Sequence, residues 1–159
     1  MSETDPEKLA ERYIAAVDAF DERMRSVPSE LVDYRENSES WSARDIALHV
    51  ADVDQLLGLR LRQILSDESP NLAAINTSAN ILRLRKARVD RALALEILAS
   101  TSAMNAALVE ILTPDEIARK GHHPHGHDVT AGDIAVFLAM HIEAHVKQIA
   151  RVLKAAQAR

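Results

Sequence analysis

Hydrophobic residues alternate with polar ones at the spacing of a helical face in four separate stretches of the chain. The first stretch runs from about Pro6 to Arg25 and ends before Pro28. Apolar side chains at every third or fourth position lie on one side of an α-helix, so this pattern predicts an amphipathic helix. Its predicted buried stripe is Leu9, Tyr13, Ala16, Val17, Phe20 and Met24.

The second predicted helix opens on a capping pattern and continues to about Ser66. Ser42 can accept a hydrogen bond from the first turn, and Asp45 can reach back to the backbone of Ser42. Trp41 and Ile46 flank this pair and can close the helix entry with an apolar contact. The predicted buried stripe is Ile46, His49, Val50, Val53, Leu56, Leu57, Leu61 and Ile64.

The last predicted helix repeats this start pattern. Thr130 and Asp133 occupy the positions equivalent to Ser42 and Asp45. Val129 and Ile134 flank them. The pattern predicts a helix over about 131–156. Its predicted inner stripe is Ile134, Phe137, Leu138, His141, His145, Ile149 and Val152.

The middle of the chain is harder to interpret. A third long helix is predicted up to Thr113, with Val89, Leu93, Ile97, Met104, Ala107, Leu108 and Ile111 as its stripe. Residues 67–85 form a connection in which 71–84 are interpreted as a short extra helix. Residues 114–129 are interpreted as a helical turn followed by a polar loop.

Four long amphipathic helices predict an all-α fold, a four-helix bundle. The composition agrees, because the chain has only 4 glycines and 5 prolines and its aromatic content is 3%. With 159 residues, of which 47% are hydrophobic, we expect one domain spanning 1–159 with a real core.

Charge and cysteine content narrow the chemistry. The chain has no cysteine, which excludes disulfides, thiolate ligands and a cysteine nucleophile. The 19 basic and 24 acidic residues give a net charge of −5, and we therefore expect no nucleic-acid partner. We recognise neither a signal peptide nor a stretch of membrane-spanning length, so we expect no membrane partner and a cytoplasmic location.

Three histidines fall within the predicted apolar stripes. His141 and His145 are four residues apart and share one helical face, and His49 has the equivalent place on the second helix. Imidazole nitrogens suit Zn, Ni, Cu or Fe(II), and three protein ligands leave a position for water or substrate. The alternative is that each histidine is an ordinary core residue, hydrogen-bonded across the bundle.

Two segments carry a resemblance to a known family. The run Trp41 to His49 resembles the Trp-Ser/Thr-x-x-Asp/Glu-hydrophobic-x-x-His segment of DinB-like (YfiT-like) proteins and mycothiol-dependent maleylpyruvate isomerases. The run His141 to Ile149 resembles their H-x-x-x-H-x-x-Q-I segment. The resemblance implies a DinB/YfiT-type bundle with a long crossover between helices 2 and 3, often dimeric. It also implies a metal bound at His49, His141 and His145.

The same resemblance implies a metal-dependent S-transferase, using a low-molecular-weight thiol, or a hydrolase acting on a small molecule. Zn or Ni is the expected ion, with Fe as a further option. The sequence identifies no catalytic or cofactor-binding residue beyond the ligands. One alternative is a non-catalytic bundle that binds a metal or another ligand, and a second is that the histidines only pack the core.

Three further features need an interpretation. Glu143 lies two residues after His141 and is therefore expected on the opposite helical side, which disfavours a zincin peptidase. The loop histidines are expected to be a polar surface, with an accessory metal tract or a general base as alternatives: His122, His123, His125 and His127. The basic run is expected to be solvated, with attraction of an acidic ligand as its alternative: Arg83, Arg85, Lys86, Arg88 and Arg91.

Overall fold

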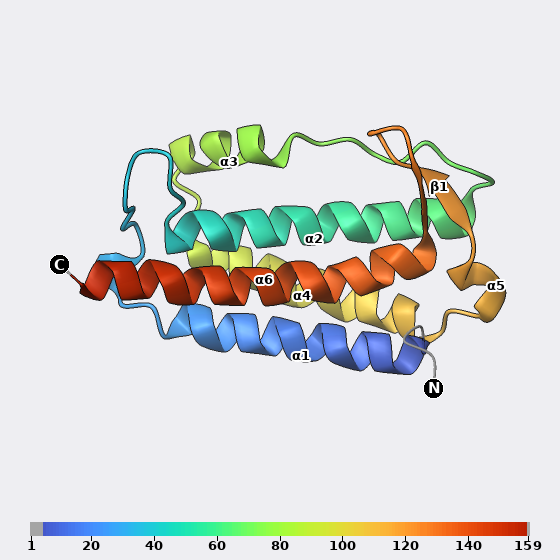
Figure 1. Cartoon of the computed structure of the whole chain (residues 1–159), viewed down its shortest axis with the longest axis horizontal. Coiled ribbons are helices and arrows are strands. Elements are labelled where there is room, and N and C mark those ends of the chain that lie inside the picture. The colour runs from blue at the N-terminus through green and yellow to red at the C-terminus, as the bar shows by residue number, and fades with distance from the viewer. Residues whose placement is uncertain (1–4, 159) are drawn as a thin grey trace.

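Four long helices pack side by side and form the body of the molecule (Figure 1). The computed structural model describes residues 5–158, so the acidic residues 1–4 lie outside the described chain. In this bundle α1 packs against α4 and α6, and α2 packs against the same two helices. The four long helices are α1 (Pro6–Arg25), α2 (Ala43–Ser66), α4 (Arg91–Glu110) and α6 (Ala131–Gln157).

The direction of the helices explains the predicted crossover. In Figure 1, α1 and α6 run one way, whereas α2 and α4 both run the other way. Because α2 and α4 are parallel, the chain must return along the whole bundle between them. It does so outside α2, through an extended segment and α3 (Thr77–Lys86). The all-helical class, the four-helix bundle and its long crossover are therefore confirmed.

The predicted start of α2 forms as expected and also joins distant segments. Ser42 accepts a hydrogen bond from the backbone N–H of Asp45, and the Asp45 carboxylate accepts one from the backbone of Ser42. The same buried carboxylate pairs with Arg35, from the loop before α2, and with Arg85, from α3. Burial raises the pKa of Asp45, but the hydrogen bonds from Arg85, Ser42 and Arg35 outweigh it and lower the pKa overall.

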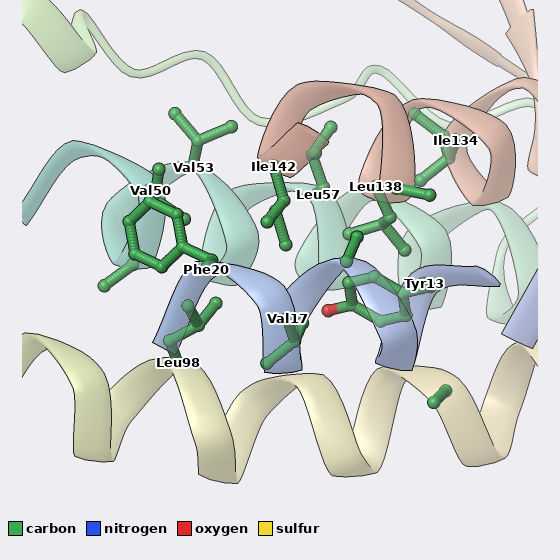
Figure 2. Packing of buried hydrophobic residues seen from close by; sticks show 14 of the residues in the cluster. Tyr13, Val17, Phe20, Val50, Val53, Leu57, Leu98, Ile134, Leu138 and Ile142 are labelled. Carbon is green, nitrogen blue, oxygen red and sulfur yellow. The ribbon is translucent and has the colours of Figure 1, made fainter. Parts of the chain in front are cut away.

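The core lies where these helices meet (Figure 2). The predicted stripes of α1 and α2 are buried throughout. Tyr13, Phe20 and Leu98 point from α1 and α4 toward the interior, and Leu138 and Ile142 approach from α6. In α6 the predicted stripe holds only in part, because Phe137 is 46% exposed.

The predicted face of α4 is wrong. Leu93, Met104 and Ile111 are 48%, 50% and 73% exposed, respectively. The opposite face is buried instead, with Ala94, Leu98, Ser102, Asn105, Ala106 and Val109. Because α4 carries apolar residues on both sides, periodicity alone does not identify the side that packs.

Polar contacts decide which side of α4 faces the bundle. The buried carboxylate of Asp54 accepts hydrogen bonds from Tyr13 (2.5 Å) and Thr101 (2.7 Å), and from Asn105 (3.3 Å). At Gly58 a Cβ would lie 2.2 Å from Oδ1 of Asn105, so only glycine allows α4 to approach α2 this closely. Ser102 and Asn105 of α4 are thus core residues, although polar side chains usually lie on the surface.

The same helix corrects the expectation about membrane spans. By length and composition alone, Arg91–Glu110 is apolar enough to cross a membrane. In the bundle, however, this helix packs against α1 and α2 through the buried polar contacts just described. Length and composition therefore do not distinguish a membrane span from a helix packed in a bundle, and 39% of this apolar window is buried here.

The segment before α6 is more ordered than the predicted polar loop. After α5 (Pro114–Ile117), β1 (Lys120–His122) pairs in antiparallel register with β2 (Asp128–Thr130). The backbone N–H of His123 donates to the carbonyl of His127, and Gly126 has a φ of +83°, which glycine adopts easily. These three-residue strands are too short to leave an alternating pattern in the sequence. Before α2, Ser29–Leu31 forms a 3-10 turn.

Candidate metal centre

The three predicted histidines converge on one point between two helices. His49 projects from α2, and His141 and His145 project from consecutive turns of α6. One nitrogen from each ring lies within 4.8 Å of the other two. The cluster lies at the seam between α2 and α6 and not deep in the core, since His49 is 9% exposed and the other two rings are half-buried.

The distances between the ring nitrogens suit a tetrahedral ion. Nε2 of His141 lies 3.2 Å from Nε2 of His49 and 3.1 Å from Nε2 of His145. Zinc binds imidazole nitrogen at about 2.0–2.1 Å, which places neighbouring tetrahedral ligands about 3.3 Å apart. The two Nε2 pairs that involve His141 therefore already have the spacing of tetrahedral ligands, and the third nitrogen lies within 4.8 Å of the others.

One ring is held by a neighbouring amide. Nδ1 of His145 donates to Oε1 of Gln148 at 2.7 Å, which leaves the lone pair of this ring on Nε2, facing the other two histidines. Such an outer hydrogen bond is the usual way to orient a metal-binding histidine. Nδ1 of His49 is buried with no hydrogen-bond partner among the described residues, so no comparable bond orients this ring.

Hydrogen bonding among the rings does not account for the cluster on its own. If His145 carries its proton on Nδ1, a proton on Nε2 of His141 could be donated to only one of its two neighbours. The other close nitrogen pair would then lack a normal hydrogen bond. The donor set thus fits a shared cation better than it fits three mutually bonded core rings.

Burial keeps these imidazoles neutral. It lowers the pKa of His49 to about 4 and that of His141 to about 3, with the neighbouring histidines as a further cause. Burial also lowers the pKa of His145, although its hydrogen bond to Gln148 opposes the shift. Neutral rings offer the lone pairs that a metal requires at neutral pH.

Trp41 forms one wall of the cluster, a role that the sequence analysis missed. Its ring centroid lies 4.6 Å from that of His49 and stacks over His145 at 6.4 Å. Sequence alone offered little signal, because Trp41 precedes the N-cap Ser42 and helical periodicity therefore does not fix its direction. The capping pattern already accounted for the tryptophan, so its contact with the histidines was not predicted.

A cavity of about 520 Å³ opens beside the histidines. Its floor includes His49 and His145, and its walls come from the loop before α2 and from the last turns of α6. Both signs of charge line it, with Glu39 on the loop side and Arg151 on α6. This volume lies in the range of small-molecule sites, so the open side of the cluster has room for a substrate.

Glu143 faces away from the cluster, as predicted. It forms a bidentate ion pair with Arg12 of α1, with N–O distances of 2.8 and 2.9 Å. Its role is therefore to join α1 to α6. A zincin-like general base is absent at this position.

Of the other predicted features, the loop histidines form no further metal cluster with three ligands in the described chain. His123 instead contacts Arg60 and stacks on His127. The expectation of a solvated basic run is only partly right. Arg85 pairs with buried Asp45, and Arg91 donates to the carbonyls of the α1 C-terminal segment, whereas Arg83, Lys86 and Arg88 are exposed.

Comparison with known proteins places this geometry in context. A family model described as the DinB superfamily matches residues 12–149. Among solved structures, YfiT from Bacillus subtilis, described as a probable metal-dependent hydrolase with an unusual four-helix bundle topology, superposes with a TM-score of 0.83. It is 18% identical, and the match covers 97% of this chain and 90% of YfiT. A search of curated proteins finds no match.

The mycothiol-dependent maleylpyruvate isomerase is also similar, with a TM-score of 0.74 and 12% identity. The match covers 91% of this chain but only 60% of the isomerase, so the present chain lacks a counterpart for a large part of that protein. At such identities the likeness concerns the fold alone.

A third structure corrects the expectation about nucleic acid. The colibactin self-resistance protein ClbS was crystallised in complex with double-stranded DNA, and it superposes with a TM-score of 0.70 at 12% identity, covering 97% of this chain and 98% of ClbS. Excluding nucleic acid from the net charge of −5 was therefore wrong for this fold. Net charge sums over the whole surface, whereas a binding face depends on local charge.

Proposed function

Because the chain belongs to the DinB superfamily, we propose that it is a metal-dependent enzyme acting on a small molecule, with His49, His141 and His145 as the ligands. The observation that carries the proposal is the convergence of one nitrogen from each ring within 4.8 Å, with Nε2 of His141 at 3.1–3.2 Å from Nε2 of each neighbour. Zn or Ni is the expected ion, because both accept three imidazoles and an exchangeable fourth ligand.

When bound, such an ion supplies Lewis-acid chemistry, either lowering the pKa of a water molecule or holding the thiolate of a small thiol. The chain's own residues prepare the site for it. Gln148 fixes the tautomer of His145, and burial keeps His49 and His141 unprotonated. Trp41 packs against the rings of His49 and His145 and also lines the cavity from which a substrate would reach the cluster.

Hydrolysis and thiol-dependent S-transfer are the two reactions that this arrangement supports. Both need one small molecule beside the cluster and a nucleophile at the open position. The cavity next to His49 and His145 provides the space, and Glu39 and Arg151 give it polar edges that can orient a ligand. The rival function is a bundle that binds a metal or another ligand without catalysis.

Metal content tests the proposal most directly. Untagged protein should contain, or bind on titration with Zn or Ni, about one ion per chain. His141→Ala removes the central nitrogen of the three and should reduce the bound metal to near the background, measured by elemental analysis after dialysis.

His125→Ala is the matched control, because this exposed loop histidine lies outside the cluster and its loss should leave metal content unchanged. Wild-type protein that neither contains nor binds metal would refute the proposal. If His141→Ala retained full metal content and lost only stability, the histidines would be packing residues. Turnover of thiol–electrophile pairs or of activated esters, abolished by a chelator, then separates the enzyme from a non-catalytic bundle.

A further inference from the structure

A second, smaller cavity lies along the same seam between α2 and α6. It has a volume of about 230 Å³, and Leu57, Ile134 and Phe137 form its apolar walls. Drug-sized ligands occupy about 300–1,000 Å³, so this space suits only one end of a small molecule. It also borders the histidine cluster, because the ring of Phe137 lies 5.7 Å from that of His141.

The cavity contains the positively charged side chain of Arg60, which forms no close ion pair in the described chain. Arg60 is half-buried, and its Nε and Nη2 donate to the backbone carbonyl of Ala73 at 3.0 and 2.8 Å. A carbonyl oxygen carries no net charge, and in the described part of the chain Arg60 forms no ion pair. Asp133 also lines the cavity, but its side chain is exposed at the first turn of α6, where one oxygen accepts from the backbone of Thr130 at 2.8 Å and no ion pair with Arg60 forms.

Around the ring of His123, in this smaller cavity, hydrogen-bond donors outnumber acceptors. Nη1 of Arg60 lies 3.1 Å from Nε2 of His123, and the backbone N–H of His125 lies 3.3 Å from Nδ1 of the same ring. A neutral imidazole has one acceptor nitrogen, so it satisfies only one of these two donors, and its own N–H is left without an acceptor. Burial and the nearby Arg60 both lower the pKa of His123. An anionic oxygen would accept from Arg60 and from the ring N–H together.

The surrounding backbone holds these donors in place. The turn between β1 and β2 is closed by hydrogen bonds from His123 to His127 and from Gly126 to His123. The ring of His127 stacks on that of His123 at 4.6 Å. The histidine loop is therefore a folded wall of the cavity, which a ligand can meet without first ordering it.

We infer that this cavity binds the carboxylate end of the substrate, with Arg60 and His123 as its hydrogen-bond donors. The inference rests on the proposed function, because it assigns the reacting end of the same molecule to the histidine cluster. Phe137 precedes His141 by four residues, and Leu57 follows His49 by eight, on the cluster-facing side of each helix. At 1.5 Å per residue, Phe137 and Leu57 lie about 6–12 Å along their helices from the cluster, and the backbone of Arg60, 11 residues after His49, lies about 16 Å from it.

A titration of the full chain, freed of metal by a chelator, tests this assignment with hexanoate as the probe and 1-hexanol as its uncharged counterpart. Hexanoate should give saturable NMR shifts at the Arg60 side chain and at the amides of His123 and Phe137, and hexanol should not. Arg60→Gln should weaken hexanoate binding about tenfold, the value of one charge-assisted hydrogen bond, and Arg60→Lys should restore part of it.

Matched variants control for folding. Arg62→Gln changes the same helix but a residue that contacts Asn105 outside the cavity, so hexanoate binding should persist. Should Arg60→Gln not fold, His123→Phe keeps the ring and removes its N–H, and it should weaken binding about threefold. His122→Phe, at an exposed position that does not line the cavity, is the corresponding control.

The outcomes separate this inference from the proposed function. Equal shifts with hexanol, absence of saturable shifts, or full binding by a folded Arg60→Gln protein would overturn the carboxylate site. None of these results depends on metal. Hexanoate binding by a chain that never binds an ion would remove the metal proposal and keep the carboxylate site, whereas metal binding without hexanoate binding would do the reverse.

Discussion

At the scale of single residues, Asp45 joins three segments through one buried carboxylate. It closes the capping box of α2 and pairs with Arg35 and Arg85, which belong to the loop before α2 and to α3. That loop also provides a wall of the larger cavity. A residue that the sequence marks only as a helix cap therefore also fixes the rim of the candidate site.

Replacing Asp45 with asparagine should lower the free energy of unfolding by about 2–3 kcal/mol at pH 7, because it removes a cap and leaves two arginines without their anion. Asp133→Asn is the matched change in α6, where the same capping box has no arginine partner in the described chain. It should cost about 1 kcal/mol. Urea denaturation measures both, and equal losses would mean that the two arginines contribute little.

The pH dependence of this effect has a defined sign. The pKa of Asp45 is lowered in the folded protein, so its carboxylate stabilises the fold above the ordinary aspartate pKa. That contribution disappears as the pH falls through the folded pKa. The difference between wild type and Asp45→Asn should therefore shrink when the same denaturation is repeated in acid.

The residues of the candidate site were predictable to different degrees. His49, His141 and His145 could be found because helical periodicity fixes the side on which each residue lies. The contact between Arg60 and His123 could not be predicted, because the two residues are 63 positions apart. It also depends on the hairpin of β1 and β2, which has no clear pattern in the sequence. Contacts between elements depend on how those elements pack, which periodicity within one element does not encode.

At the scale of elements, α4 shows where pattern reasoning fails. Its two sides are both apolar enough to be buried, and the side that packs contains Ser102 and Asn105. The polar network around Asp54 selects that side. The stripe of α1 was predicted correctly because the opposite face is charged, and the stripe of α2 was predicted correctly because that helix is buried on most of its sides.

A pair of substitutions in α4 tests the assignment of its faces. Leu98→Ala removes a side chain that is 1% exposed, and it should lower the free energy of unfolding by about 2–5 kcal/mol through the cavity it leaves. Met104→Ala alters the predicted but exposed face, and it should change stability by no more than about 0.5 kcal/mol. Thermal or urea unfolding of both variants would show the reverse order if the sequence-based face were correct.

At the scale of the whole molecule, the histidine cluster makes stability depend on pH. Burial lowers the pKa of His49 to about 4 and of His141 to about 3, whereas an unfolded histidine titrates near pH 6.5. Between these values unfolding takes up protons, so acidification destabilises the folded state. The metal-free protein should thus lose stability as the pH falls from 7 toward 4.

His141→Gln should reduce the fall of the unfolding free energy with decreasing pH, because it removes one group that must stay neutral in the folded state. His125→Gln, at an exposed position, serves as the control and should follow the wild type. Unfolding free energies at a series of pH values, with a chelator present, provide the comparison. Identical slopes for His141→Gln and wild type would mean that this ring is not held neutral.

The two helices that carry the cluster come from distant parts of the chain, since His49 and His141 are 92 residues apart. An ion bound by both would act as a reversible cross-link between the first and second halves of the chain. Closing a loop of that length removes entropy from the unfolded chain worth about 4–5 kcal/mol in the case of a disulfide. This cross-link could form only after α6 has been synthesised. A chelator would remove it and would therefore destabilise the folded protein as a mild denaturant does.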